Sequence, residues 1–346
     1  MLRLKRILCQ GYVEWEGFSR EEGPITRWTV RSSPVAPNSL TTARPAAART
    51  AREKARGYVE LMKLRIIELL LITTVPTMVL AERGWPGWGL VASTLVGGTL
   101  AAGAANAWNM ICDRDIDAVM NRTKNRPLVT GVVSVRGAIV FSSFLTVGSL
   151  LWFGLLINWM TALFALLAML IYVVGYTMIL KRRTPQNIVW GGIAGCMPVL
   201  IGWSAVTGSL DWPPLLLFLV VFFWTPPHYW PLSIKFKKDY ARAGVPMAPV
   251  VQENTTVAWH MIVHSAAMVA STLILIPVAP MGWIYSAAAV VAGAWFLGLV
   301  VRLYMRARHP EKGPLAAMKV FHGSIYYLSI VFLAVGIDPF GPQFLL

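Results

Sequence analysis

Six stretches of this chain contain no Lys, Arg, Asp or Glu, and they constrain its fold more than any other feature. They are residues 84–112, 137–180, 184–210, 212–234, 254–301 and 320–337. A helix needs about 20 apolar residues to cross the roughly 30 Å hydrocarbon core of a bilayer. Helices of this length satisfy their own backbone hydrogen bonds in lipid. The sequence therefore predicts an all-α integral membrane protein.

The lengths of these stretches also predict the number of spans. Residues 137–180 and 254–301 are each long enough for two helices, with breaks near 156–159 and 277–283. A first helix near residues 66–81 brings the total to about nine. Composition agrees, because only 14% of the residues are charged, whereas soluble domains carry about 25%.

The basic residues indicate how the chain is oriented. With nine helices, one side of the bilayer holds residues 1–65, 111–136, 181–183, 234–256 and 302–319. These segments contain every Lys and Arg except Arg83. The positive-inside rule then predicts a cytoplasmic N-terminus in a multi-pass protein of the cell membrane. The net charge of +15 describes topology and gives no support for a nucleic-acid partner.

The first 56 residues differ from the rest of the chain. They are polar and show no sustained periodicity, which predicts a disordered cytoplasmic tail before a transmembrane domain at 57–346. Residues 24–51 contain no acidic residue, as in organelle transit peptides, but four glutamates between residues 14 and 22 count against that interpretation. A bacterial membrane is favoured, and the mitochondrial inner membrane is the alternative.

The strongest chemical signal lies at the end of the second expected span. Asn109, Asp113 and Asp117 are spaced i, i+4, i+8. If the helix continues, all three project from one face over about 12 Å. Oxygen-bearing side chains in a row suit a hard cation such as Mg²⁺, held partly by substrate phosphate.

Basic residues crowd the same loop, which suggests a bound metal–polyphosphate. They are Arg114, Arg122, Lys124 and Arg126. The alternative is a solvated helix end whose aspartates simply pair with arginines. Asn109 favours the metal site, because it is embedded in an apolar run and polar groups inside a span usually face a functional cavity.

A second acidic loop, residues 235–247, follows the sixth expected span. Four crossings separate it from the first motif, so both loops are expected on the same side. Asp239 could complete the metal site opposite Asp113. A surface ion pair with a neighbouring Lys is the other interpretation, and the sequence alone leaves both open.

The first motif, continued by Met-Asn-Arg-Thr-Lys-Asn-Arg-Pro-Leu at 120–128, resembles the UbiA superfamily of membrane prenyltransferases. Further segments resemble its haem O synthase (protohaem farnesyltransferase) branch: 176–184, 187–195, 198–203, 224–230 and 239–247. The resemblance runs from about residue 58 to the C-terminus. The chain departs from it at Lys238, where members often carry an aspartate beside Asp239, and at Leu64, where a proline is common.

The resemblance implies transfer of the farnesyl group of farnesyl diphosphate to a vinyl group of haem b, giving haem O. It assigns Mg²⁺ and catalysis to Asn109, Asp113, Asp117 and Asp239. The expected contacts to the diphosphate are cationic: Lys63, Arg65, Arg122, Arg126, Lys181 and Arg182. It also suggests a downstream haem-modifying enzyme or a terminal oxidase assembly as a partner.

Aromatic residues near the expected cytoplasmic ends could stabilise a farnesyl cation through their π-faces. The candidates are Tyr176, Trp224, Tyr229 and Trp230. They could equally be belt residues, since Trp and Tyr concentrate at membrane interfaces. His228 is interpreted either as a contact to haem or as a hydrogen-bonded structural residue.

Two other functions compete with haem farnesylation. A prenyltransferase of the same superfamily acting on an aromatic quinone precursor would share the first motif. A multi-pass transporter would place polar groups near the bilayer midplane. In this sequence the carboxylates lie at the ends of the expected spans, which favours an enzyme.

Overall fold

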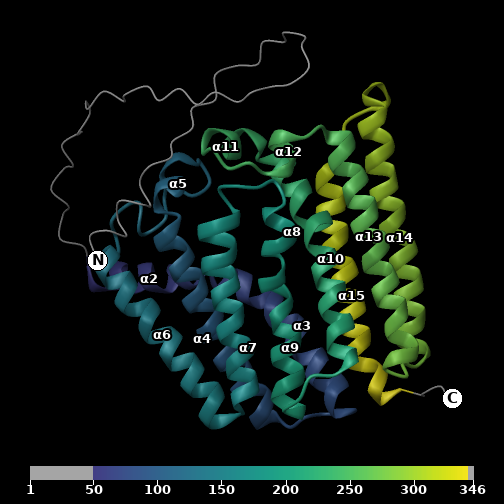
Figure 1. Ribbon diagram of the computed structural model, residues 1–346, viewed down its shortest axis with the longest axis horizontal. Coiled ribbons are helices and arrows are strands. Elements are labelled where there is room, and N and C mark those ends of the chain that lie inside the picture. Colours follow the sequence, from purple (N-terminus) through teal and green to yellow (C-terminus); the bar gives the residue numbers. More distant parts are fainter. Residues whose placement is uncertain (1–49, 342–346) are drawn as a thin grey trace.

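The computed structural model describes residues 50–341, apart from the side chains of residues 65–71 and 312. That part of the chain is a bundle of helices without strands (Figure 1). The long helices are α3 (Leu64–Glu82), α4 (Trp88–Cys112), α6 (Val135–Leu156), α7 (Trp159–Leu170), η1 (Ile171–Leu180), α9 (Ile193–Thr207), α10 (Trp212–Lys235), α13 (Asn254–Val278), α14 (Trp283–Arg308) and α15 (Ala317–Ile337). The shorter ones are α2 (Ala51–Met62), α5 (Arg114–Val119), α8 (Asn187–Gly191), α11 (Lys237–Arg242), α12 (Ala248–Val251), η2 (Pro310–Lys312) and η3 (Asp338–Phe340).

Eight helical segments in the described part are long and apolar enough to cross a membrane. Three of them are composite, because α7 continues into η1, α8 into α9 and α15 into η3. Helix α3, described with side chains from Ile72 onward, lies where the first of the nine expected spans was predicted. The all-α multi-pass architecture predicted from the uncharged stretches is confirmed.

The break expected within residues 137–180 occurs at Ile157 and Asn158. Asn158 begins α7, and its side-chain oxygen accepts a hydrogen bond from the Thr161 amide at 2.9 Å. Its amide nitrogen donates to the Ser204 carbonyl at 2.8 Å, which ties the turn to α9. A polar turn is stable here because a side chain satisfies backbone groups that the helix ends leave free.

Small residues allow the long helices to pack closely. A Cβ atom on Gly97 would lie only 2.8 Å from the ring of Phe153, so α4 and α6 approach each other at this glycine. Phe153 itself is fully buried. Between membrane helices, where lipid removes most of the hydrophobic driving force, such close packing is a main source of association.

Helix α2 begins at Ala51, ahead of the domain boundary expected at residue 57. The Thr50 hydroxyl accepts from the Glu53 amide, and the Glu53 carboxylate accepts from the Thr50 amide, which together form a capping box. The tail prediction therefore has to end before Thr50. Residues 1–49 lie outside the described residues, so their disorder stays a prediction.

Helices α5, α11 and α12 lie together at one end of the bundle, called here the polar end (Figure 1). Asn121, in the loop after α5, donates to Asp239 of α11 at 3.4 Å. The two acidic loops are therefore neighbours, as the parity of the crossings predicted. The connection between α14 and α15 is at the same end.

Candidate active site

The three residues of the first motif share one face, although the helix that carries them is interrupted. Helix α4 ends at Cys112 and α5 begins at Arg114. Backbone hydrogen bonds from Asp113 to Asn109 and from Asp117 to Asp113, at 2.9 and 2.8 Å, carry the i, i+4 ladder across the junction. All three residues are at least 97% buried.

Two lysines from distant parts of the chain meet this row. Lys63, between α2 and α3, donates to the Asn109 side-chain oxygen at 2.8 Å. Lys181, after η1, lies 2.5 Å from Oδ2 of Asp113. Asn109 donates its amide to the same Asp113 oxygen at 2.8 Å and to the Thr177 hydroxyl at 3.0 Å. One buried network thus connects residues from three parts of the sequence.

Asp117 is paired within its own loop. Nη1 of Arg126 lies 2.5 Å from Oδ2 of Asp117, and the Thr123 hydroxyl donates to the Asp117 carbonyl at 3.1 Å. The loop after α5 folds back in successive turns, which brings Arg126 to the carboxylate. Arg126 therefore joins Lys63 and Lys181 as the third cation around two buried aspartates.

The electrostatics of Lys63 indicate an excess of positive charge. Burial lowers its pKa to about 7, and the nearby charges of Arg126 and Lys181 act in the same direction, while Asp113 and Asp117 act to raise it. Three cations face two carboxylates without complete compensation. A bound polyanion would restore the protonated lysine, because opposite charge favours the charged form.

One oxygen in this network has no hydrogen-bond partner among the described residues. It is Oδ1 of Asp113, which is fully buried. Buried polar atoms are rarely left unpaired, so this acceptor indicates a ligand position. Asp113, Asp117 and Asn109 supply the oxygen donors that Mg²⁺ prefers, and the residues present therefore fit that ion.

The second acidic loop is organised differently. Asp239 is 9% exposed and pairs with Arg242 of its own helix at 3.0 Å. Arg122 donates to the Tyr240 hydroxyl at 3.4 Å and lies over the ring of Phe236. Within residues 50–341, as far as they are described, no three Asp, Glu, His or Cys side chains form a metal cluster. An ion bound at Asp113 would need water or phosphate to reach Asp239.

Arg182 binds outside the buried row. Its guanidinium contacts both oxygens of Asp115, at 2.6 and 2.7 Å, and donates to the Cys112 carbonyl at 3.1 Å. Burial acts to raise the pKa of Asp115, but hydrogen bonding and the charge of Arg182 together hold it below its usual value. This pair is partly exposed and fastens η1 to the start of α5.

The π-helix η1 sets the position of Thr177 and Lys181. The Lys181 amide donates to the Tyr176 carbonyl at 2.8 Å, and the Thr177 hydroxyl donates to the Tyr172 carbonyl at 2.8 Å. Tyr172 and Tyr176 stack with centroids 5.8 Å apart. Gly191 makes room for this pair, because a Cβ there would lie 2.3 Å from the Tyr176 ring.

His228 belongs to α10 and packs against α15. Its ring stacks on Trp224 at 4.1 Å and on Phe321 at 4.7 Å. Nδ1 is 2.8 Å from the Ser324 hydroxyl, and the Trp224 indole donates to the Ser324 carbonyl at 2.6 Å. Trp224 and Trp230 are buried, so neither is a membrane-belt residue.

Tyr229 of α10 interacts electrostatically with three other phenols, Tyr172 and Tyr176 of η1 and Tyr240 of α11. The charge of Asp113 acts on the same three phenols, so these tyrosines are in electrostatic range of the buried network. Burial raises the pKa of Tyr240 to about 12, which keeps that phenol neutral.

Sequence reasoning missed several residues of this site. Thr177 bonds Asn109, Asn121 bonds Asp239, and Ser324 bonds His228. Thr177 could have been found, because it lies inside segment 176–184, whereas nothing in the sequence pairs Ser324 with His228. Arg65 lies in α3, two positions after Lys63, and its side chain is not among those that the structure describes.

A buried carboxylate pair surrounded by cations lies at one end of a membrane helix bundle, and its charges and oxygen donors suit a polyanion together with a metal ion. Comparison with known proteins gives the family. The chain belongs to the UbiA prenyltransferase family, whose model matches residues 70–325.

Among curated relatives, the chain is 56% identical over 289 residues to "Protoheme IX farnesyltransferase" of Clavibacter sepedonicus, covering 84% of this chain and 94% of the relative. It is also 56% identical over 302 residues to the protein of that name from Streptomyces avermitilis, covering 87% and 99%.

Solved structures share the fold at low sequence identity. A digeranylgeranylglyceryl phosphate synthase matches with a TM-score of 0.69 and 18% identity, covering 83% of this chain and 99% of that one. A UbiA homolog from Archaeoglobus fulgidus bound to DMAPP and Mg²⁺ matches with a TM-score of 0.58 and 18% identity, covering 81% and 99%.

Proposed function

We propose that the chain is a protohaem farnesyltransferase that acts at the cytoplasmic face of the cell membrane. The allylic carbon–oxygen bond of farnesyl diphosphate breaks, the farnesyl carbon bonds to a vinyl group of haem b, and water supplies the hydroxyl of the resulting hydroxyethylfarnesyl side chain. The similarity to protoheme IX farnesyltransferases extends over nearly their whole length and supports this choice of substrates.

One observation carries the proposal, namely the buried network of Asn109, Asp113 and two lysines around an oxygen that no described residue satisfies. Asn109, Asp113 and Asp117 would hold Mg²⁺, which when bound neutralises diphosphate charge as a Lewis acid. Asp239 is proposed as a further ligand, with phosphate or water bridging the two loops.

The cations of the site would stabilise the leaving group. Bond breaking moves negative charge onto the diphosphate, and preorganised cations at that position lower the barrier because they need no reorganisation. Lys63, Lys181 and Arg126 already surround the carboxylates. Arg122 donates to the Tyr240 hydroxyl beside the second acidic loop and would orient the outer phosphate.

The acceptor side would be formed by aromatic residues. Tyr176 is in electrostatic range of both Tyr229 and Asp113, and the two rings would stabilise a farnesyl cation through their π-faces. Trp224 and His228 form a rigid stack that is proposed to contact the porphyrin. A partner that receives haem O remains part of this proposal.

The test is an assay of membranes that contain the full chain, supplied with haem b, farnesyl diphosphate and Mg²⁺. We expect farnesylated haem with release of diphosphate, and no product when the metal is chelated. In parallel, the same membranes receive an aromatic quinone precursor with the same donor. Prenylation of the aromatic acceptor without farnesylated haem would overturn the assignment of haem as acceptor.

A further inference from the structure

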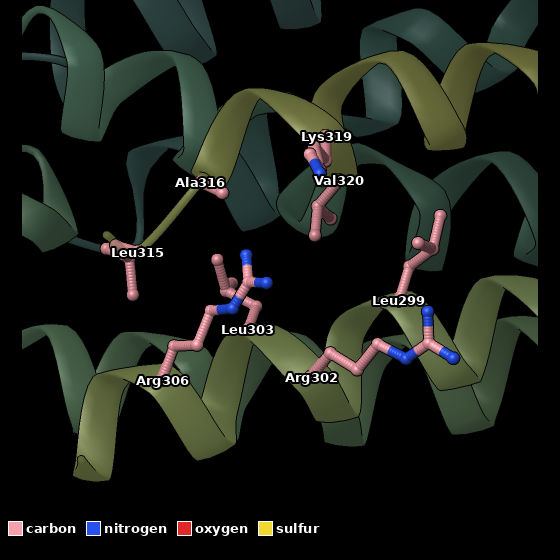
Figure 2. A pocket seen from close by; sticks show the side chains of 8 residues that line it. All are labelled: Leu299, Arg302, Leu303, Arg306, Leu315, Ala316, Lys319 and Val320. Atoms are coloured by element: carbon pink, nitrogen blue, oxygen red, sulfur yellow. The ribbon is translucent and has the colours of Figure 1, made fainter. Parts of the chain in front are cut away.

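Helices α14 and α15 enclose a cavity of about 130 Å³ at the polar end, away from the carboxylates (Figure 2). Arg302 and Arg306 of α14 and Lys319 of α15 line it, together with Leu299, Leu303 and Leu315. Figure 2 shows the two arginines projecting from α14 on the side that faces α15. Three cations thus converge on one apolar recess.

None of these three cations forms an ion pair with a side chain in the described part of the chain. No carboxylate of the described residues lines the cavity. The nearest acidic residue in sequence, Glu311, pairs with His309. Asp338 is at the opposite end of α15, where it accepts from the amides of Gly282 and Tyr285. The recess is therefore an uncompensated site for an anion.

The beginning of α15 adds to this positive potential. Ala316 precedes the helix with a φ of 53°, and no described side chain caps the amides of the first turn. The helix dipole favours an anion at this position. This effect adds to the charges of Arg302 and Arg306 on the neighbouring helix α14.

A second cavity of about 130 Å³ lies along the same two helices and is entirely apolar in its lining. It is formed by Ala288, Val291, Ala292 and Trp295 of α14 and Ile330 of α15. On α14 the residues of both cavities recur every three or four positions from Ala288 to Arg306, so they share one helix face. On α15 Lys319 and Ile330 are three turns apart and also share a face.

Gly323 of α15 packs against the part of α14 that lies between the residues of the two cavities. A Cβ at this position would lie 2.6 Å from Leu299, which lines the first cavity, and 3.6 Å from Trp295, which lines the second, so the small residue lets Leu299 pack closely on α15. The apolar part, from Leu299 to Ala288, spans about 16 Å at 1.5 Å per residue. This matches one leaflet of a roughly 30 Å hydrocarbon core.

We propose that the surface between α14 and α15 that carries the two cavities binds one anionic glycerophospholipid. Its phosphate would lie among Arg302, Arg306 and Lys319, and an acyl chain would lie along the apolar cavity toward Ala288. A basic recess beside an apolar groove one leaflet deep fits a lipid better than a free phosphate, because a free phosphate has no apolar part to occupy the groove. Basic pockets between membrane helices are a recurring means of binding such head groups.

The test uses the purified full chain in detergent, titrated with palmitoyl-oleoyl phosphatidylglycerol or the matching phosphatidylcholine, and bound lipid is counted by native mass spectrometry. We expect one tightly retained phosphatidylglycerol and weaker phosphatidylcholine. The triple variant R302Q/R306Q/K319Q should bind phosphatidylglycerol on the order of a hundredfold more weakly, since each basic contact is worth about fivefold.

The control for the single variants Arg302→Gln and Arg306→Gln is Arg308→Gln, which also removes one positive charge from α14 but outside the cavity and should leave retention unchanged. A thermal melt of each variant shows that it is folded. Equal retention by the triple variant and the wild type, or equal retention of the two lipids, would overturn the proposal. So would displacement of phosphatidylglycerol by inorganic diphosphate or by farnesyl diphosphate at equal concentration, because the site would then be one for phosphate or for the prenyl donor.

Discussion

The two acidic loops lie side by side at the polar end, but they use their aspartates in different ways. Asp113 is 1% exposed, and its cationic partner Lys181 comes from a different helix of the bundle. Asp239 is 9% exposed, and its partner Arg242 lies three residues further along the same short helix. The cationic partner of Asp113 comes from a distant part of the chain, whereas that of Asp239 is local, and within the described residues the only longer-range hydrogen bond to Asp239 comes from Asn121 at 3.4 Å.

This difference has energetic consequences. Removing one member of a buried ion pair leaves an uncompensated charge in a low-dielectric interior, at a cost of about 3–5 kcal/mol, whereas exposed pairs contribute about 0–1 kcal/mol. Substitution of the buried Asp113 in the first loop is therefore expected to lower both the free energy of unfolding and the activity. Of the ion pair in the second loop only Arg242 is exposed, so its substitution should have little effect on the fold and serves as the reference for a change at the more buried Asp239.

The largest effect is expected for Asp113→Asn. This change keeps the shape of the side chain and removes the charge that would bind Mg²⁺ and orient Lys181. Farnesyl transfer should fall roughly 10³-fold, the upper range for loss of one preorganised electrostatic group. Activity is measured in membranes, and a melting curve confirms that the variant folds. Activity at the wild-type level would remove Asp113 from the metal site.

Lys181→Gln should have the next largest effect. It removes a cation from the proposed diphosphate site and leaves Asp113 without its ion pair. We expect kcat to fall about 10²-fold and the KM for farnesyl diphosphate to rise. The measurement is kcat and KM for the donor. A change in melting temperature with unchanged kinetics would make Lys181 structural only.

Asp239→Asn and Arg242→Gln together test the second loop. If Asp239 completes the metal site, its substitution should lower activity about tenfold and raise the Mg²⁺ concentration needed, whereas Arg242→Gln should change activity less than about twofold. If the carboxylate only forms the ion pair, the two variants will show the same small effect. A titration with Mg²⁺ distinguishes these outcomes.

The smallest effect is expected for Asp115→Asn. Its side chain is 56% exposed and pairs with Arg182, which is 37% exposed. Exposed pairs contribute about 0–1 kcal/mol, so both the free energy of unfolding and the activity should stay close to wild type. A loss of activity as large as that of Asp113→Asn would mean that Arg182 acts on the diphosphate directly.

The sequence predicted the span boundaries well where charge is the deciding factor. The stretch 212–234 became α10, and the stretch 84–112 contains α4, since burying an unpaired charge in hydrocarbon is too costly for a span to include one. The start of α2 was missed because its surface is polar, and only the Thr50–Glu53 capping box signals it.

The site was predictable to the extent that it follows helical spacing. Asn109, Asp113 and Asp117 share a face because the hydrogen-bond ladder continues through Asp113. The assignment of partners was not predictable, since Lys181 and Arg182 are adjacent in sequence but bind Asp113 and Asp115 separately. That choice depends on tertiary geometry, as does the stack of His228 between Trp224 and Phe321.

The wide turns of the π-helix η1 determine the direction in which Lys181 leaves the helix, and the proposed site depends on that direction. The Lys181 amide bonds the carbonyl five residues earlier, at Tyr176, and the Lys181 side chain reaches Asp113 from this π-helical end. Deleting a single residue between Tyr172 and Lys181 would rotate Lys181 about the helix axis. A lysine could then be present in the sequence and still point away from its aspartate, so the number of residues in this helix matters as much as their identity.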